Sequence, residues 1–185
     1  MNPIDELLTE HEAVKTTLKI LKRIGQDVAK TGKIENPKHL DQLFDFFITF
    51  VDQCHHSKEE AHLFPALEEV GVSREGGPVG VMFKEHQQGR DLVSKMKAAA
   101  RQYESGDKEA AKKFTQHAND YIALLDFHID KENKVLFPMA NDHLPDSKLE
   151  ELRKEFDRIE TDKIGPGRHE AFHKMIDTMK GVYLQ

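Results

Sequence analysis

The sequence has few of the residues on which disulfide frameworks, thiolate metal sites and membrane spans depend. Cys54 is the only cysteine among the 185 residues, and there is no tryptophan. A single cysteine excludes an internal disulfide bond and a cysteine-based zinc finger. The longest apolar run covers residues 46–51, is interrupted by Thr49 and is far too short to span a bilayer. We therefore expect neither a disulfide scaffold nor a membrane segment.

An excess of positive charge is also missing. Lys and Arg number 27 against 33 Asp and Glu, which gives a net charge of −6. That balance is wrong for a protein that binds nucleic-acid phosphates. The first residues lack the basic and apolar regions of a signal peptide, and no phosphate-binding glycine loop or nucleophile elbow occurs. We expect a cytoplasmic monomer or weak homodimer that binds neither nucleic acid nor a membrane.

Apolar residues recur at helical spacing along five stretches, which glycine and proline separate. The stretches cover residues 4–30, 37–70, 79–104 and 108–137, and a fifth follows Pro145. No stretch alternates with period two, so we expect an all-α fold. Four long helices with short connections predict an up-down-up-down four-helix bundle over residues 1–140. A C-terminal helical extension over residues 141–185 is expected to pack on the same domain.

Polar residues interrupt these apolar faces at positions where apolar side chains are expected. A glutamate buried without a partner is strongly unfavourable, so something must compensate it. The residues in question are four histidines and two glutamates: His11, His55, Glu59, His86, His128 and Glu132.

The same residues form an imperfect internal repeat. Glu10-His11 recurs as residues 85–86, and the pattern His-xxx-Glu-xxx-Leu-Phe-Pro occurs at residues 55–65 and again at 128–138. Counted from the predicted turns, the six side chains lie at nearly the same height in a bundle that rises ~1.5 Å per residue. Residues at i and i+4 also share a helix face. Four imidazoles and two carboxylates therefore converge, which predicts a metal site.

Six donors with twofold pseudosymmetry suit two ions better than one. Each ion would receive two histidines, and the two glutamates could bridge the ions. Imidazole with carboxylate suits iron, manganese or zinc. The alternative pair His56 and Glu60 belongs to a polar line through Asp52 that we expect to face solvent, so we choose His55 and Glu59. We expect Leu-Phe-Pro to mark a helix end after each pair.

Three further residue groups have other expected roles. Cys54 is expected to be a small buried hydrophobe. Tyr121, two turns before His128, is expected to be a core aromatic with a satisfied hydroxyl rather than a donor to a bound ligand. His169 and His173 have metal-pair spacing but no clear third ligand, so we expect a packing face.

At the six residues the sequence resembles hemerythrin-like proteins with an HHE cation-binding domain, over about residues 4–140. The resemblance implies an oxo- or hydroxo-bridged non-haem di-iron centre that binds or reduces a small diatomic or peroxide, with a redox partner possible. One departure is Arg90, which stands where oxygen carriers have a second histidine on the third helix. His62 could replace that ligand, but Val135 at the equivalent repeat position favours a nearby, non-binding role and rapid oxidation.

Three functional classes follow from this resemblance. The first is a protein that stores or senses oxygen, and the second is an enzyme that reduces peroxide or nitric oxide. An iron donor for iron–sulfur cluster repair belongs with the second class but usually has an N-terminal cysteine-bearing segment, which is absent before residue 4. The third is a metal-storage or structural helical bundle.

Overall fold

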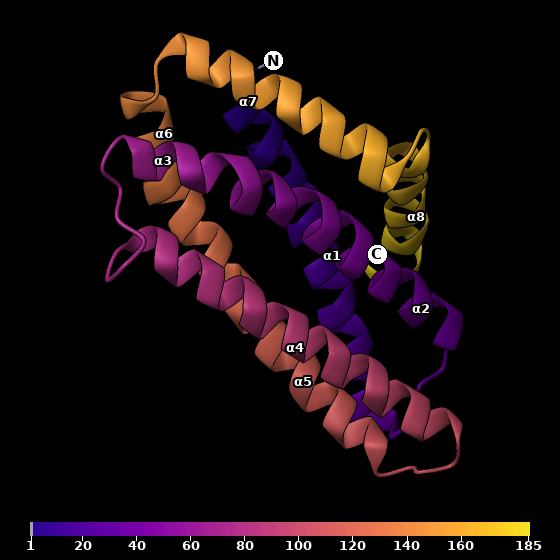
Figure 1. The fold of residues 1–185 in the computed structure, drawn as a ribbon. Coiled ribbons are helices and arrows are strands. Elements are labelled where there is room, and N and C mark those ends of the chain that lie inside the picture. The colour runs from indigo at the N-terminus through magenta and orange to yellow at the C-terminus, as the bar shows by residue number, and fades with distance from the viewer. Residues whose placement is uncertain (1) are drawn as a thin grey trace.

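The computed structural model describes residues 2–185, and every regular element in that range is helical (Figure 1). The predicted all-α fold is confirmed. The elements are α1 (Pro3–Thr31), α2 (Pro37–Asp45), η1 (Phe46–His56), η2 (Glu59–Leu63), α3 (Phe64–Glu69), α4 (Pro78–Glu104), α5 (Ala110–Lys131), η3 (Glu132–Leu136), α6 (Phe137–His143), α7 (Asp146–Ile159), η4 (Glu160–Ile164) and α8 (Arg168–Tyr183), where η marks π-helical segments.

Local sequence signals set the ends of α1. The side chain of Asn2 accepts a hydrogen bond from the backbone N–H of Ile4 at 2.9 Å, and Pro3 occupies the first turn, where no N–H is needed. The helix ends at Gly32, whose φ of 68° is left-handed and costs glycine little.

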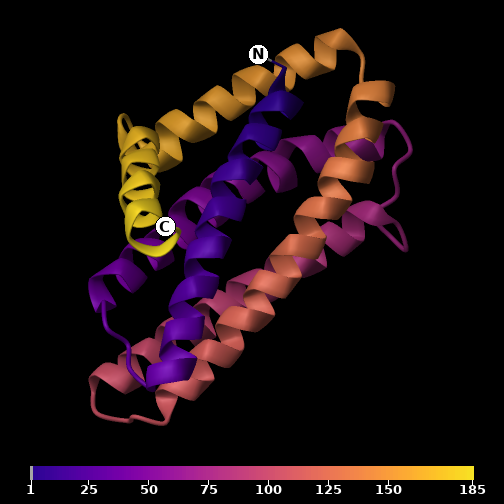
Figure 2. The same ribbon diagram turned by 180° about the vertical axis from the view of Figure 1, so that it is seen from behind.

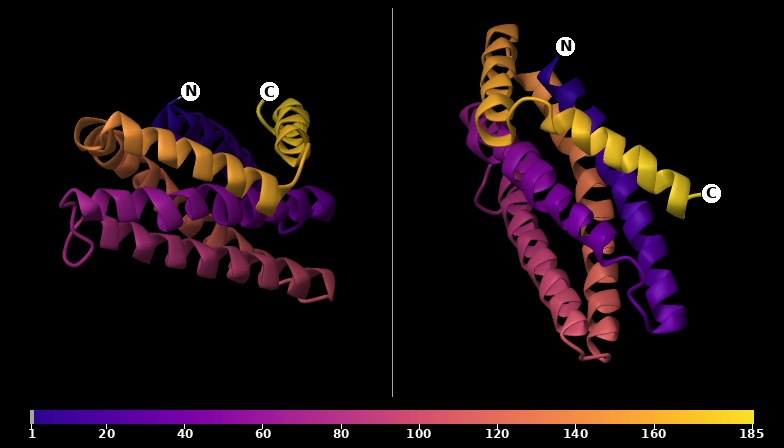
Figure 3. Two further views of the ribbon diagram at one scale, coloured as in Figure 1. Left: turned by 45° about the horizontal axis from the view of Figure 1, so that its top comes forward. Right: turned by 90° about the vertical axis from the view of Figure 1, so that its right-hand side faces the viewer.

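The long helices lie along one another in a bundle. Helices α4 and α5 run side by side in opposite directions, and α1 packs against α5 (Figures 1 and 2). The stretch from α2 to α3 is one continuous helical path that passes twice through π-helical turns. It lies between α4 and the C-terminal helix α7 in the left view of Figure 3.

Leu-Phe-Pro does not end a helix, contrary to the sequence-based expectation. The chain continues past Pro65 as α3 and past Pro138 as α6, which extends to His143 rather than ending near residue 137. A π-helical segment precedes each motif, and the proline then occupies the first turn of a new α-helix. A proline in that turn loses no hydrogen bond and avoids the clash of a helix interior.

The apolar core is divided into two clusters with the polar residues between them. One cluster contains Phe47, Val93 and Leu125 on the side of the α4–α5 turn. The other contains Leu63 and Phe137 near the opposite end of the bundle. Each long helix therefore carries its polar site residues between two dry, close-packed zones, which limits contact of those residues with water.

The C-terminal elements pack on the bundle through the same apolar cluster. Helix α8 crosses α1, and η4 packs against η1 (Figure 3). The ring of Phe172 on α8 contacts the ring of Phe46 edge-on, with 5.5 Å between centroids. No helix in residues 2–185 has the length and hydropathy of a membrane span.

Candidate metal centre

The structure brings the six predicted residues together in the middle of the bundle. They come from α1, η1, η2, α4, α5 and η3. Each is almost completely buried, with exposed fractions of 0–2% for His11, His55, Glu59, His86, His128 and Glu132. Six ionisable side chains thus share a volume from which water is excluded.

The four predicted imidazoles face one another in two pairs. The Nε2 atoms of His11 and His55 are 3.0 Å apart. The Nε2 atoms of His86 and His128 are 3.1 Å apart. Each pair joins one helix of a repeat half to the other helix of the same half.

The opposite ring nitrogen of each histidine has a fixed partner. The Nδ1 atom of His55 lies 2.7 Å from a Glu10 carboxylate oxygen, and that of His128 lies 2.9 Å from Glu85. The corresponding partners are Glu60 for His86 and the amide oxygen of Asn133 for His11. These oxygens only accept hydrogen bonds when the carboxylates are ionised, so each Nδ1 donates its proton. A ring that carries only its Nδ1 proton directs the Nε2 lone pair to the centre, as a metal ligand does.

The two glutamates lie between the imidazole pairs. Glu59 oxygens are 3.5 Å from His55 Nε2 and 3.4 Å from His86 Nε2. Glu132 oxygens are 3.2 Å from the Nε2 atoms of both His11 and His128. All four carboxylate oxygens lack a hydrogen-bond partner. Each glutamate therefore spans the two halves of the repeat.

This donor arrangement fits bound cations. Facing Nε2 lone pairs at about 3 Å repel each other unless a proton or a metal ion lies between them. Buried carboxylates without partners are likewise costly. Metal ions satisfy both sets of atoms at once, and the Nδ1–H bonds to acceptors are the outer contacts that metal-bound histidines generally make.

The pKa values of these buried side chains show that their charges destabilise one another when no metal ion is present. Burial and the neighbouring Glu132 carboxylate raise the pKa of Glu59 well above its ordinary value. Burial acts in the same direction on Glu132, but His128 and His11 outweigh it and hold the pKa of Glu132 well below its ordinary value. Burial lowers the pKa of His86, and the adjacent rings of His56 and His128 lower it further. The two buried carboxylates therefore cannot both be ionised without nearby positive charge.

A fifth histidine, His56, also faces the centre, so its expected exposure to solvent was wrong. It is 4% exposed, and its ring stacks on His86 with 3.7 Å between centroids. The reason is η1, whose wider π-helical turn holds more residues than an α-turn. Consecutive residues are then separated by a smaller angle, and His55 and His56 both point inward. Both ring nitrogens of His56 lack a hydrogen-bond partner.

The donors divide into two unequal groups. One group contains three imidazoles and a carboxylate, from His56, Glu59, His86 and His128. The other contains two imidazoles and two carboxylates, from His11, His55, Glu59 and Glu132. Glu59 belongs to both groups. One candidate ion therefore has an additional imidazole within reach that the other lacks.

A buried lysine supports the first half of the repeat from outside. Lys58 is completely buried, and its ammonium contacts Glu10 at 2.6 Å and Glu160 of η4 at 2.8 Å, as well as Glu6. Glu10 in turn accepts the Nδ1 proton of His55. The C-terminal extension thus reaches the candidate centre through a chain of charged contacts, which the sequence did not predict.

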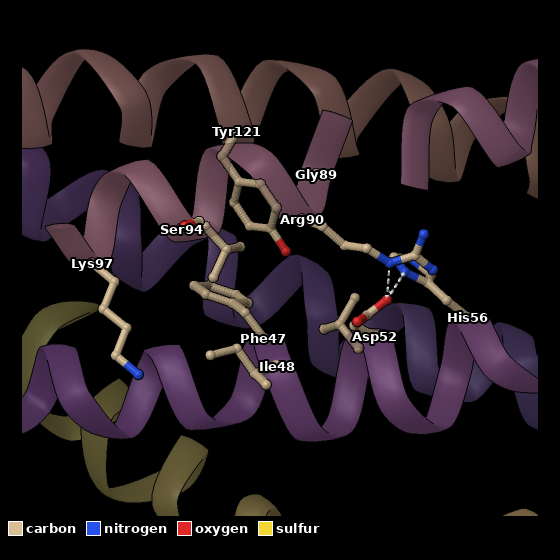
Figure 4. A pocket seen from close by; sticks show the side chains of 11 residues that line it. Phe47, Ile48, Asp52, His56, Gly89, Arg90, Ser94, Lys97 and Tyr121 are labelled. Carbon is tan, nitrogen blue, oxygen red and sulfur yellow. Dashed lines mark hydrogen bonds and ion pairs between the residues drawn. The ribbon is translucent and has the colours of Figure 1, made fainter. Parts of the chain in front are cut away.

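Arg90, like Lys58, holds carboxylates that lie beside the histidines of the candidate centre. Its guanidinium donates to Asp52 at 2.7 Å and also to Glu60, which accepts from His86 (Figure 4). Asp52 lies 3.5 Å from the Nδ1 of His56, a distance longer than a good hydrogen bond. The residue that replaces the missing histidine thus holds the carboxylates beside two imidazoles.

The remaining sequence candidates lie outside the ligand groups. His62 is partly exposed and does not join either group. Tyr121 is buried among core aromatics, with 5.0 Å between the centroids of its ring and that of Phe47. Cys54 is 0% exposed, in agreement with a small buried hydrophobe. His169 lies near Glu10 and Glu160, where the Lys58 ammonium already provides the cation.

Comparison with known proteins places this geometry in a family context. A family model described as "Hemerythrin HHE cation binding domain" matches residues 2–140. Uncharacterized proteins of Mycobacterium bovis and of two Mycobacterium tuberculosis strains are 25% identical to this chain over 182 residues. The alignments cover 97% of this chain and 70% of each relative. The similarity to these relatives therefore continues beyond the family match into the C-terminal extension.

Proposed function

This chain belongs to the hemerythrin HHE cation-binding domain family, and on that premise we propose that it is a non-haem di-iron protein that binds or reacts with O₂, nitric oxide or peroxide. The coarser statement, a metal-binding helical protein, follows from the family match and the buried His/Glu cluster. The step to two iron ions and to these ligands is the proposal.

One observation carries the proposal. Two pairs of imidazole Nε2 atoms face each other at 3.0 and 3.1 Å, and the carboxylate oxygens of Glu59 and Glu132 have no partner. Nitrogen and oxygen donors without thiolate suit iron, manganese and zinc. Iron supplies a redox-active Lewis acid on which a small ligand can bind, whereas zinc does not change its oxidation state.

The residues would hold the two ions unequally. His56, His86 and His128 would serve one ion, and His11 and His55 the other, with Glu59 and Glu132 between them. The ion with two imidazoles has one imidazole donor fewer than the other and is our candidate for the position that takes the small ligand. The expectation of rapid oxidation rested on a missing fifth histidine, and under this proposal His56 would provide that imidazole in place of His62.

The chain's own residues would control the surroundings of the ligand. Ring stacking of Phe137 on His11, with 5.2 Å between centroids, closes one side of the pair that includes His55. Glu10 and Asn133 hold these two rings in one tautomer by accepting the Nδ1 protons. The apolar clusters on either side exclude water from the group.

Metal content and optical spectra test the proposal together. We expect two iron ions per chain by elemental analysis of protein produced with iron, and spectral changes when the reduced protein receives O₂, then peroxide, then nitric oxide in separate samples. His128→Ala should lower the iron content, while His62→Ala should not. One zinc ion per chain, with no spectral response to any of the three ligands, would contradict the proposal.

A further inference from the structure

A pocket opens beside the candidate centre and reaches the surface between η1 and α4 (Figure 4). Its volume is about 310 Å³. A water molecule occupies about 30 Å³ in the liquid, so the pocket exceeds by far the space that a diatomic molecule or peroxide needs. Volumes of this size are typical of sites for small organic molecules.

The walls and the two ends of the pocket differ in chemistry. Phe47, Val51 and Val93 provide apolar walls, and Gly89 lines the pocket beside the Tyr121 ring. The inner end reaches His56, whose ring belongs to a ligand group. This end is therefore next to the candidate metal centre, although the pocket itself needs no metal to exist.

A phenol hydroxyl points into the pocket. Tyr121 is 2% exposed, and its hydroxyl is directed toward the middle of the pocket in Figure 4. Its oxygen is not among the buried polar atoms that lack a partner, because it faces the open pocket. Burial raises the pKa of Tyr121, so the phenol stays protonated and can donate a hydrogen bond. The hydroxyl is therefore a donor available to a ligand oxygen in the pocket.

The outer end of the pocket carries a positive charge that no carboxylate neutralises. Two cationic residues line the pocket, and Arg90 is already paired with Asp52 and Glu60. Lys97 is exposed at the opposite end from His56 and forms no ion pair within residues 2–185 (Figure 4). Ser94 lies beside it at the mouth.

We propose that this pocket binds an amphipathic organic carboxylate whose anionic group pairs with Lys97 and whose far end carries an oxygen that accepts from the Tyr121 hydroxyl. The apolar body lies between Phe47, Val51 and Val93. This inference goes beyond the proposed function, because the contacts come from the protein alone and do not depend on bound iron.

Two related probes test it by calorimetry on metal-free and iron-loaded protein. The probes are 4-hydroxyphenylacetate and phenylacetate, which differ only by the oxygen at the far end. Lys97→Ala should raise the Kd of both probes about tenfold or more, since it removes a charge-assisted contact. Tyr121→Phe should raise the Kd of 4-hydroxyphenylacetate several-fold and leave that of phenylacetate unchanged. Ser94→Trp should block both probes, because the indole would fill the mouth.

Lys95→Ala is the matched control, because Lys95 is exposed on the same helix and does not line the pocket. Equal losses for Lys95→Ala and Lys97→Ala would show only general surface charge and would overturn the proposal. Absence of probe binding to folded wild-type protein in both metal states would overturn it too. Iron content is measured separately, so probe binding without iron, or iron without probe binding, shows which of the two proposals has failed.

Discussion

The two halves of the internal repeat build the same contacts around the site histidines but bury them to different extents. In the first half Glu10 accepts from His55 and pairs with Lys58, and in the second Glu85 accepts from His128 and pairs with Lys131. The lysines differ most: Lys58 has a side-chain exposure of 0%, whereas Lys131 has 41%. The difference arises because η4 of the C-terminal extension covers the first half only.

The halves also differ in their fifth imidazole and in their outer charges. The residue in the second half that corresponds to His56 is Ile129, which joins the apolar cluster. Glu60 accepts from His86, whereas neutral Asn133 accepts from His11. A duplicated framework therefore holds two chemically different positions, and this asymmetry can be tested residue by residue.

The largest expected effect is loss of metal from both positions. Chelation should lower the melting temperature, because an ion at 1,000 times its Kd adds about 4 kcal/mol to the free energy of unfolding for each site. The double variant Glu59→Gln/Glu132→Gln should bind little metal, yet its metal-free form should melt above metal-free wild type, since the like charges are gone. Calorimetry of the four samples checks this, and equal melting of the two metal-free proteins would contradict it.

The next effect separates the two lysines. Lys58→Met should lower the free energy of unfolding by about 3–5 kcal/mol, because it leaves buried carboxylates without their cation. Lys131→Met, the matched change in the other half, should cost about 1 kcal/mol or less, as exposed pairs do. Urea unfolding of both variants measures the difference. Similar losses in the two variants would mean that the extension does not distinguish the halves.

A smaller effect concerns the fifth imidazole. His56→Ala should weaken one metal position on the order of 100-fold while the other keeps its affinity, because only one ligand group contains His56. His62→Ala is the control, since His62 lies outside both groups. Competition with a calibrated chelator reports the two affinities. Equal weakening of both positions by His56→Ala would show that the groups are not separate.

The smallest expected effects concern the reactivity of Cys54 and the stability contribution of Phe127, its counterpart in the repeat. Burial raises the pKa of the Cys54 thiol to about 12, so a thiol reagent should not modify the folded protein at neutral pH. Phe127 is 72% exposed, and Phe127→Ser should change the free energy of unfolding by no more than about 0.5 kcal/mol. Thiol titration with and without denaturant, and urea unfolding, provide the measurements. Rapid modification of native protein would be the contrary result.

Much of this arrangement could be predicted from the sequence, because the helical spacing of apolar residues and the internal repeat both indicate it. Heptad spacing located the helices, and the repeat showed that His11, His55, His86 and His128 share one level with the glutamates. Residue identity and helical rise suffice for that inference. The confirmed all-α fold follows from the same spacing.

The parts that the sequence did not predict depend on local changes in backbone hydrogen bonding and on how the C-terminal helices pack against the bundle. The π-helical turns of η1 shift backbone bonds without changing the apolar pattern, so the inward position of His56 was missed. The π-helical turns before Pro65 and Pro138 have the same origin. Because of them, the helix end expected at each Leu-Phe-Pro motif was wrong. The contact between Lys58 and Glu160 depends on where α7 and η4 pack, which no local pattern in the bundle specifies.

The contact between Lys58 and Glu160 also has a consequence for the order of events during synthesis. The two residues are separated by 102 positions in the chain. At about 5–20 residues per second, a ribosome needs on the order of 5–20 s to cover that distance. The bundle helices emerge first, and the third carboxylate for Lys58 arrives only after them, with η4. The outer support of His55 is therefore complete only after the whole bundle and η4 have been synthesised.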